Sequence, residues 1–455
     1  MSIAAAIFRQ NDIRGVVGDD LTIEAAGAIG GAFALYLARH GVTQPVAVGR
    51  DNRPNGMALR DALVAGLTAS GVDVVDIGVV PTPLLYWSLS HLDVGAGIQI
   101  TGSHNPPAYN GFKICVGKET LHGEGIQELH RLATSGVFTS GAGTVRHETV
   151  IDRYIDDIVR RIGPLAHPPR VVIDCGNGAG ALVAPSLFRK LLPDAKCLYC
   201  ESDGTFPNHH PDPTVIENLR PLIAEVTRGA YDFGVAFDGD ADRIGVVDST
   251  GQVIWGDYLL ILYARDVLAR TGKGQPIIFD VKCSQALPDA VARAGGRPVM
   301  WKTGHSLIKG KMKELGAPVA GEMSGHMFFT ESFYGHDDAV YAAARLMRIV
   351  SEAGQPIEAL LADVPRFVST PEIRIDCPDD RKFAIVDEAV KHFSRDHEVV
   401  GVDGARVLFG EGWGLIRASN TQPVLVARFE AKTAEQLTRI RTVMENWLRS
   451  QGITP

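Results

Sequence analysis

The most constraining feature of the sequence is an alternation of short apolar segments with longer amphipathic ones, which continues from Pro45 to about Arg366. This alternation predicts βαβ units, and therefore sheets with parallel strands and helices on their faces. Three times along this stretch, a polar loop of unusual composition follows a late strand. Because such sheets carry their chemistry in the loops at the carboxyl ends of parallel strands, these loops are the first candidates for a functional site.

The pattern changes after Arg366. Strands are predicted over residues 367–375 and 399–409, and further strands follow at hairpin-like spacing. A final helix is predicted to begin at Thr433, which has the spacing of a capping box with Gln436. The last part of the chain therefore reads as a smaller α+β domain.

A chain of 455 residues is too long for one hydrophobic core. We predict three related α/β domains with mixed, mostly parallel sheets, followed by the C-terminal α+β domain. The predicted domains span residues 1–148, 149–250, 251–366 and 367–455.

The composition argues against two classes of partner. A net charge of −8 disfavours a nucleic-acid backbone or an anionic membrane surface, although local basic residues still allow small anionic substrates. No apolar run approaches the roughly 20 residues of a membrane span, and the apolar patch at the N-terminus is too short for a secretory signal. We predict a cytoplasmic enzyme, a monomer or a dimer, that acts on small molecules.

Six cysteines are scattered along the chain and do not form a disulfide framework. Cys197 and Cys200 have the spacing of a redox pair. Because both lie in an apolar, strand-like run, we predict two buried, reduced thiols.

The first polar loop, Thr101-Gly-Ser-His-Asn-Pro, presents Ser103 and His104 between a glycine and a double proline. The glycine permits a close backbone approach, and the prolines restrict the loop. A serine held in this way suits covalent catalysis, but a polar turn that closes a strand has a similar composition. The loop alone does not decide between the two interpretations.

The second polar loop, Asp238-Gly-Asp-Ala-Asp242, places three carboxylates at alternate positions directly after an apolar strand. Carboxylates in this pattern can converge on one hard cation such as Mg²⁺. An EF-hand is excluded, because Arg243 and Ser249 stand where its glycine and glutamate belong. An acidic surface turn is the alternative, but three uncompensated charges next to a buried strand would be costly. We predict a metal site at Asp238, Asp240 and Asp242.

Two further loops have compositions that suit a phosphorylated sugar. In Gly321-Glu-Met-Ser-Gly-His326, Glu322 and Ser324 suit a pair of sugar hydroxyls and His326 suits proton transfer, although a capping loop would look alike. The run Arg417-Ala-Ser-Asn-Thr421 offers donors and no acidic residue, which suits a phosphate as well as a hairpin turn.

Two other motifs are interpreted as structural. The cluster Gly176-Asn-Gly-Ala-Gly180 lacks the acidic residue that a dinucleotide site would need, so we predict tight packing between a strand and a helix. His209 and His210 are consecutive and point in different directions on an extended backbone, so an ordered, proline-rich turn is expected.

Together with Asp12-Ile-Arg-Gly15, the four polar loops resemble the motifs of the α-D-phosphohexomutase family, in the family's order and over the whole chain. The resemblance is to the bacterial phosphomannomutase/phosphoglucomutase branch. It implies domains arranged around a central cleft and reversible phosphoryl transfer between the C1 and C6 oxygens of hexose phosphates. The implied cofactors are Mg²⁺ and a hexose 1,6-bisphosphate, which serves as activator and intermediate.

The resemblance also implies a role for each candidate residue. Ser103 would be the phosphoserine, and its oxygen would share Mg²⁺ with Asp238, Asp240 and Asp242. The residues implied to contact the substrate are Asn11, Arg243, Lys282, Gly304, His305, Glu322, Ser324 and His326. Those implied to hold the phosphate that does not react are Arg417, Ser419, Asn420 and Thr421. The sequence does not rank the other catalytic candidates, which are His104, Lys113, Arg14 and His326.

One position departs from the family pattern. Asn11 stands where the branch has a tyrosine, just before Asp-Ile-Arg-Gly. This departure leaves the balance between mannose and glucose substrates open.

Two other functions compete with a mutase. The strand that ends in Phe237-Asp-Gly-Asp240 fits the nucleophile loop of a Mg²⁺-dependent, haloacid-dehalogenase-like sugar phosphatase. Such an enzyme leaves the Ser103, Glu322 and Arg417 loops without a role. A non-catalytic phosphosugar-binding protein uses the sugar and anion loops but does not explain a serine with three metal-binding carboxylates. A mutase accounts for all four loops.

Overall fold

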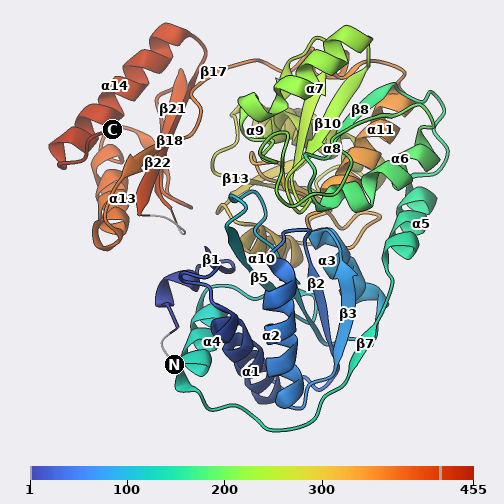
Figure 1. Cartoon of the computed structure of the whole chain (residues 1–455). Coiled ribbons are helices and arrows are strands. Elements are labelled where there is room, and N and C mark those ends of the chain that lie inside the picture. Colours follow the sequence, from blue (N-terminus) through green and yellow to red (C-terminus); the bar gives the residue numbers. More distant parts are fainter. Residues whose placement is uncertain (1–2, 420–422) are drawn as a thin grey trace.

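A computed structural model describes residues 3–419 and 423–455. It contains four β-sheets that follow one another along the chain, and the fourth, with its two helices, stands to one side of the others (Figure 1). Within the described part of the chain, no helix is long and apolar enough to span a lipid bilayer.

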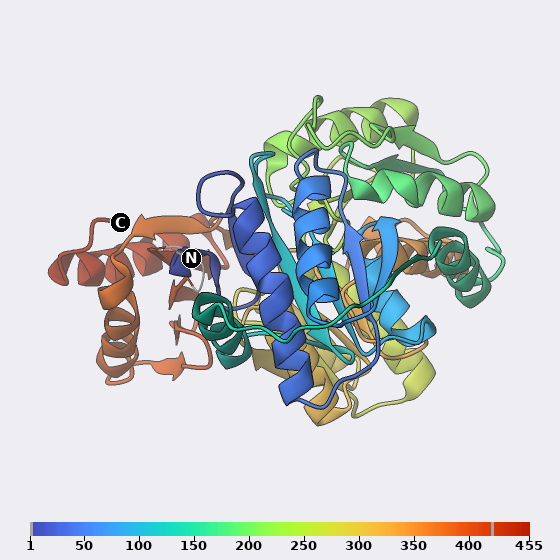
Figure 2. The same cartoon turned by 60° about the horizontal axis from the view of Figure 1, so that its bottom comes forward.

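The first sheet has the strand order β1-β5-β4-β2-β3-β7, and β6 pairs with β5. β2 is parallel to β3 and β4, whereas β5 runs antiparallel to β4 and β1. The strands are β1 (Ile13–Val16), β2 (Val46–Arg50), β3 (Val74–Val79), β4 (Ala96–Ile100), β5 (Tyr109–Val116), β6 (Glu119–Thr120) and β7 (Val145–His147). The helices are η1 (Ala5–Ile7), α1 (Ile23–Arg39), α2 (Gly56–Ala69), α3 (Thr82–His91) and α4 (Glu124–Ser135). α1 and α2 lie side by side (Figure 2).

The second sheet has the order β12-β11-β10-β8-β9, with β8 parallel to β9 and β10, and β11 antiparallel to β10. Its strands are β8 (Val171–Asp174), β9 (Lys196–Leu198), β10 (Phe233–Phe237), β11 (Ile244–Asp248) and β12 (Val253–Ile254). The helices of this part are α5 (Ile151–Ile162), η2 (Ala179–Leu182), α6 (Ala184–Leu191) and α7 (Ile216–Gly229).

The third sheet has the order β14-β13-β15-β16, and only its β15–β16 pair is antiparallel. Its strands are β13 (Pro276–Asp280), β14 (Arg297–Trp301), β15 (Val319–Gly321) and β16 (Met327–Phe329). The accompanying helices are α8 (Gly256–Thr271), α9 (Ala286–Arg293), α10 (His305–Leu315), α11 (Ala339–Ala353) and α12 (Ile357–Leu360).

The fourth sheet is antiparallel, with the order β17-β22-β21-β20-β19 and β18 paired to β22. Its strands are β17 (Val368–Ser369), β18 (Ile373–Asp376), β19 (Glu398–Val400), β20 (Ala405–Leu408), β21 (Gly412–Ala418) and β22 (Val424–Ala431). The helices are α13 (Asp379–Phe393) and α14 (Ala434–Ser450). The fold class predicted from the sequence, three α/β units with mixed sheets and a C-terminal α+β unit, is confirmed.

The hydrophobic cores correspond only partly to the four sheets. One large cluster of buried side chains joins the second and third sheets and reaches the first through residues such as Trp87. The first sheet has a second cluster on its α1 side, and the fourth sheet has a cluster of its own. The first three sheets therefore form one packed body.

Two predicted strands are each divided. The strand predicted over residues 367–375 is divided into β17 and β18, which are separated by Thr370, Pro371 and Glu372; proline cannot donate to a ladder. The strand predicted over residues 399–409 is an antiparallel hairpin of β19 and β20. The capping box at Thr433 is confirmed.

The prediction of buried, reduced thiols at Cys197 and Cys200 is wrong. The two residues form a disulfide, and Cys197 is exposed. β9 is the last strand at one side of the second sheet, so one of its edges has no partner strand. The chain then turns at Tyr199, whose φ is 50°, and Cys200 returns to Cys197. The remaining cysteines are free and buried; they are Cys115, Cys175, Cys283 and Cys377.

Candidate active site

Three polar loops from three different sheets meet at one place. Each joins a parallel strand to an antiparallel neighbour: β4 to β5, β10 to β11, and β15 to β16. Ser103 Oγ in the first loop donates to Asp238 Oδ2 in the second at 2.9 Å. Asp242 Oδ1 in the second lies 3.6 Å from His326 Nδ1 in the third. A Cβ at Gly239 would stand 2.4 Å from the Ser103 carbonyl oxygen, so only glycine permits this approach.

Ser103 itself has a backbone conformation that few residues other than glycine adopt. Its φ is 48° and the residue is 3% exposed. Its N–H donates to Thr101 Oγ1 at 2.8 Å, and its Oγ lies 3.1 Å from His104 Nδ1. Such conformations persist where the surroundings fix them, and they are concentrated at functional sites.

A buried ion pair that the sequence analysis missed fixes the Ser103 loop. Asp51 Oδ2 accepts hydrogen bonds from Thr101 Oγ1 at 2.9 Å and from the Gly102 N–H at 3.0 Å. Arg53 pairs with Asp51 at 3.2 Å and also donates to carbonyl oxygens along the loop. Those carbonyls belong to Ser103, Asn105, Pro106 and Tyr109. A rigid guanidinium fork satisfies several acceptors at once, so Arg53 is a positioning residue for Ser103.

We expect Arg53→Lys to lower kcat about 10- to 100-fold with a much smaller effect on KM, because a single ammonium cannot bridge the carbonyls of the loop and Ser103 shifts. The free energy of unfolding should also fall by about 2–3 kcal/mol, as buried carbonyls lose their donors. Steady-state kinetics and chemical denaturation measure the two effects. Arg60→Lys, in α2, is the matched control, and an unchanged kcat in Arg53→Lys would exclude the positioning role.

The carboxylates of the second loop form a closely spaced, fully buried cluster. Ligand oxygens of Asp238, Asp240 and Asp242 lie within 4.8 Å of one another. Burial, reinforced by the charges of Asp242 and Asp240, raises the pKa of Asp238 well above its usual value. Among the described residues, Asp240 Oδ1 and Asp242 Oδ1 have no hydrogen-bond donor. Unpaired buried carboxylate oxygens at this spacing fit a divalent cation.

Lys113, on β5, is the lysine of this site. Its Nζ donates to Asp240 Oδ2 at 2.9 Å and pairs with Asp242. Burial alone would lower the pKa of Lys113, but Asp240 and Asp242 outweigh burial and raise it. Lys113 is therefore a fixed cation that serves as a hydrogen-bond donor.

Arg14 and His104 flank the serine. Arg14 donates to the Gly102 carbonyl oxygen at 2.7 Å and to Asp12 at 2.5 Å. Burial, together with the charges of Arg243 and Arg14, lowers the pKa of His104 well below its usual value. The His104 imidazole next to Ser103 is thus neutral near pH 7.

The third loop holds a preorganised carboxylate. Glu322 Oε1 accepts from the Gly304 N–H at 2.7 Å, and its Oε2 accepts from Ser324 Oγ at 3.1 Å. Asn11 lies against this turn, since a Cβ at Gly304 would stand 3.2 Å from its Nδ2. Asn11 thus connects the first domain to the loop that is implied to bind the sugar.

His326 is oriented by groups on both sides of its ring. Its Nε2 lies 2.9 Å from Arg243 Nε, which is always a donor, so Nε2 accepts and the proton of the neutral ring is on Nδ1. That atom lies 3.1 Å from Asp337 Oδ2, and His305 Nδ1 lies 3.9 Å from the same oxygen. Burial and Lys309 lower the pKa of His305 well below its usual value. Asp337, which the sequence analysis did not identify, orients the His326 ring.

The remaining predicted residues lie between the third and fourth sheets. Lys282 Nζ donates to Glu372 at 2.7 Å, and the charge of Lys282 lowers the pKa of Glu372 to about 2. Arg417 Nε donates to Asp403 Oδ2 at 3.1 Å, and the same oxygen accepts from the Thr303 N–H at 3.0 Å. Asp403 therefore connects the Arg417 loop to the Gly304 turn.

The structure brings most predicted residues into one connected set. The contiguous residues around the serine and the carboxylates are Arg14, Ser103, His104, Lys113, Asp238, Asp240, Asp242, Arg243, His305 and His326. Asn11, Gly304, Glu322 and Ser324 form a second group, which Asp403 joins to Arg417. Ser419 is buried, and its N–H donates to the Val424 carbonyl at 3.0 Å. Asn420 and Thr421 lie outside the described residues.

Models of known families match four successive ranges of the chain. Four models match, each described as part of phosphoglucomutase/phosphomannomutase: alpha/beta/alpha domain I over residues 5–135, domain II over 152–251, domain III over 255–367 and the C-terminal domain over 372–446.

Individual relatives are similar over nearly the whole of both chains. The chain is 50% identical over 452 residues to a phosphomannomutase/phosphoglucomutase of Pseudomonas aeruginosa, covering 99% of this chain and 96% of that one. It is 45% identical over 445 residues to a phosphoglucomutase of Neisseria gonorrhoeae, covering 97% and 96%. A solved structure of a phosphoglucomutase/phosphomannomutase family protein from Burkholderia thailandensis superposes with a TM-score of 0.91 at 42% identity, covering 99% and 98%.

Proposed function

Because the chain belongs to the phosphoglucomutase/phosphomannomutase family, we propose that it interconverts hexose 1- and 6-phosphates through a phosphoserine at Ser103 and a hexose 1,6-bisphosphate. The observation that carries this mechanism is the position of the Ser103 hydroxyl, 2.9 Å from one carboxylate of a buried acidic cluster. A phosphoserine there carries about two negative charges, and it would be repelled by the cluster unless a divalent cation lay between them. A metal site next to the serine therefore suits phosphoryl transfer.

The proposed metal ligands are Asp238, Asp240, Asp242 and an oxygen on Ser103. Mg²⁺ bound there would neutralise charge on the transferring phosphoryl group. The protein's own cations add to this effect: Lys113 is held against Asp240, and Arg14 is held at the Gly102 carbonyl. Phosphoryl transfer depends chiefly on positioning and charge neutralisation, which these fixed groups supply.

The proposed proton-transfer pair is His326 with Asp337, at a separation of 3.1 Å. Asp337 lies against Nδ1 of the ring, while Arg243 donates to Nε2 and restricts rotation of the ring. The His104 imidazole, 3.1 Å from Ser103 Oγ, is a second group that can accept a proton. Glu322, whose oxygens are already oriented by Gly304 and Ser324, is the proposed acceptor for sugar hydroxyls.

Arg417, with Ser419, Asn420 and Thr421, is the proposed clamp for the phosphate that does not react. One clamp and one phosphoserine allow a 1-phosphate and a 6-phosphate to bind in opposite orientations. The bisphosphate must turn over between the two transfers, so the fourth domain is proposed to open and close on the others. Lys282 and Glu372 link the third and fourth domains across that boundary.

We expect Arg417→Ala to raise KM for glucose 1-phosphate about 10- to 100-fold, because a charged hydrogen bond to a phosphate contributes about 1.5–3 kcal/mol. The rate of Ser103 phosphorylation by excess bisphosphate should change less. Arg439→Ala, which removes an exposed arginine of the same domain, serves as the control. An unchanged KM in Arg417→Ala would remove this residue from the clamp.

The sugar preference is tested by comparing kcat/KM on glucose 1-phosphate and mannose 1-phosphate with the matching bisphosphate present. Turnover of at least one of them to the 6-phosphate is expected. Release of inorganic phosphate without isomerisation would instead indicate a phosphatase.

A further inference from the structure

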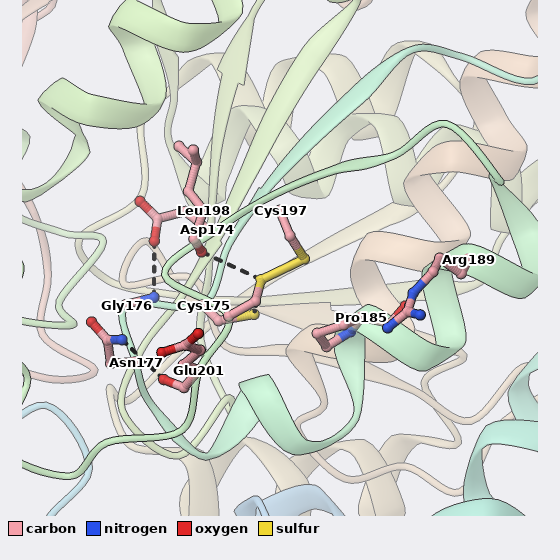
Figure 3. The surroundings of a disulfide bond; sticks show 10 residues. Asp174, Cys175, Gly176, Asn177, Pro185, Arg189, Cys197, Leu198 and Glu201 are labelled. Carbon is pink, nitrogen blue, oxygen red and sulfur yellow. Dashed lines mark hydrogen bonds between the residues drawn. A yellow bond between two sulfur atoms is a disulfide. The ribbon is translucent and has the colours of Figure 1, made fainter.

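The disulfide between Cys197 and Cys200 lies in the second domain, next to the loop of Cys175, Gly176 and Asn177 (Figure 3). Cys197 is exposed on the edge strand β9, whereas Cys200 is half-buried. Both cysteines line a shallow hollow, together with Pro185, Phe188 and Arg189. A small thiol or the active site of a dithiol protein can therefore reach Cys197.

Hydrogen bonds connect the segment that contains the disulfide to the glycine-rich loop that follows β8. The Cys175 N–H donates to the Leu198 carbonyl at 3.1 Å, and the Asn177 N–H donates to the Tyr199 carbonyl at 2.9 Å. The Asn177 side chain donates to the Glu201 carbonyl at 2.9 Å (Figure 3). Residues 198–201 thus run alongside residues 175–177 and depend on them for hydrogen bonds.

The chain that leaves the disulfide reaches the Ser103 loop within a few residues. Gly204 packs on Asn52 and Arg53, where a Cβ would stand 2.3 Å from the Asn52 carbonyl oxygen. The guanidinium of Arg53 lies 5.1 Å from the centre of the Phe206 ring. His210 contacts the His104 carbonyl oxygen. Residues 201–210 therefore cover the groups that position Ser103.

Two residues of the segment 199–210 have unfavourable backbone conformations. Tyr199 and Phe206 have φ values of 50° and 54°, in a region that is unfavourable for residues other than glycine. Such a conformation persists only where the surroundings of the residue fix it. Tyr199 lies between the two cysteines. The disulfide therefore holds the two ends of this turn, Cys197 and Cys200, together.

We propose that the Cys197–Cys200 disulfide is a thiol–disulfide exchange site through which a dithiol reductant lowers the mutase activity. Reduction removes the covalent restraint on Tyr199 and loosens residues 201–210. Arg53 then loses its contact with Phe206, and the His104 carbonyl loses its contact with His210. As a result, Ser103 is held less firmly. Oxidation restores the restraint and the activity.

The dithiol is the only reductant that the thiol–disulfide exchange requires. One thiolate of the dithiol attacks Cys197 Sγ, the bond between Cys197 and Cys200 breaks, and Cys200 leaves as a thiolate that takes up a proton. The second thiolate of the dithiol attacks the mixed disulfide, and Cys197 leaves in turn. Two electrons pass to the protein, and the reductant ends as a disulfide. Attack at Cys197 is favoured because Cys197 is an exposed residue, whereas Cys200 is half-buried.

A third cysteine lies next to the pair and does not interfere. Cys175 Sγ is 3.4 Å from Cys200 Sγ, but Cys175 is fully buried. Burial and the neighbouring Asp174 raise the pKa of Cys175 well above its usual value, so it stays a thiol and is a poor nucleophile.

The test titrates the purified, oxidised protein with dithiothreitol and follows three readouts at each point. Alkylation and mass spectrometry report the free thiols, steady-state assays report kcat on glucose 1-phosphate, and hydrogen exchange reports residues 201–210. We expect alkylation of Cys197 and Cys200 to rise together, kcat to fall about three- to tenfold, and exchange to quicken. Oxidised dithiothreitol should reverse all three changes.

The double variant Cys197→Ser/Cys200→Ser should have the kcat of the reduced wild type and ignore dithiothreitol. Cys377→Ser, which alters a buried thiol of the fourth domain, should respond as the wild type does. Alkylation of both cysteines before any reductant is added, or full reduction with unchanged kcat and exchange, would overturn the proposal. If the oxidised protein shows no mutase activity at all, the proposed function fails, while alkylation and exchange still decide the redox site.

Discussion

Ser103→Ala is expected to lower mutase kcat by at least about 10⁴-fold, because it removes the atom that accepts and returns the phosphoryl group. The hydroxyl has no substitute in the same position: Ser103 Oγ alone reaches Asp238 Oδ2, at 2.9 Å, among the side-chain hydroxyls of its loop. A coupled assay of glucose 1-phosphate conversion, with glucose 1,6-bisphosphate present, measures the loss.

The control for this variant is Ser135→Ala, which removes a hydroxyl at the end of α4 that donates to the Leu132 carbonyl. It should keep wild-type kcat. Ser103→Ala should still fold, and it should still bind the bisphosphate with an affinity near that of the dephosphorylated wild type. If Ser103→Ala interconverts the two phosphates at the wild-type rate, the phosphoserine mechanism is wrong.

Asp238→Asn is expected to reduce kcat/KM by about 10²- to 10³-fold and to weaken Mg²⁺ binding. It removes one charge of the acidic cluster and replaces the carboxylate that accepts from the Ser103 hydroxyl with a neutral amide. Titration of activity with Mg²⁺, together with calorimetric Mg²⁺ binding, separates the loss of metal from the loss of rate.

Stability distinguishes this effect from damage to the fold. Burial and the neighbouring carboxylates raise the pKa of Asp238, so its charge is unfavourable when no metal is bound. Asp238→Asn should therefore unfold without Mg²⁺ at the same temperature as the wild type or higher, and Mg²⁺ should stabilise it less. Asp73→Asn, whose carboxylate accepts from Thr144, is the control. Unchanged Mg²⁺ affinity in Asp238→Asn would exclude this residue as a ligand.

The loops of the site were predictable because their polar composition and their position after an apolar strand both indicated a functional site. Each candidate loop follows an apolar strand, and the structure places three of them at the same point of three related sheets. The carboxylates at Asp238, Asp240 and Asp242 were recognisable because three acidic side chains next to a buried strand repel one another strongly unless a cation binds between them.

The residues that hold the loops in place were missed, although a signal was present. Asp51, Asp174 and Asp280 each follow or end a central strand. Asp51 and Asp280 each accept a hydrogen bond from a neighbouring loop, and Asp174 accepts one from the Gly176 N–H in the loop that follows it. One aspartate at the same point of three repeated units is a pattern the sequence contains. Asp337 had no such signal, because an acidic pair before a helix is common as a cap, and only the fold brings it to His326.

Contacts that depend on the tertiary arrangement were beyond the reach of sequence patterns. The Arg417 loop contains no acidic residue of its own, but Asp403, from the preceding hairpin, pairs with Arg417. Likewise, the disulfide depends on β9 being an edge strand, which is a property of strand order and not of local composition. Such features depend on the arrangement of segments that are separated in the sequence.

The most direct test follows the phosphoryl group itself. Dephosphorylated enzyme is mixed with glucose 1,6-bisphosphate labelled with ³²P, quenched at millisecond intervals, and mapped by peptide mass spectrometry. The mechanism predicts that the label appears on Ser103, survives hydroxylamine, and passes to glucose 1-phosphate at least as fast as steady-state turnover. Label on Asp238 that hydroxylamine removes, or a phosphoserine that forms more slowly than turnover, would contradict it.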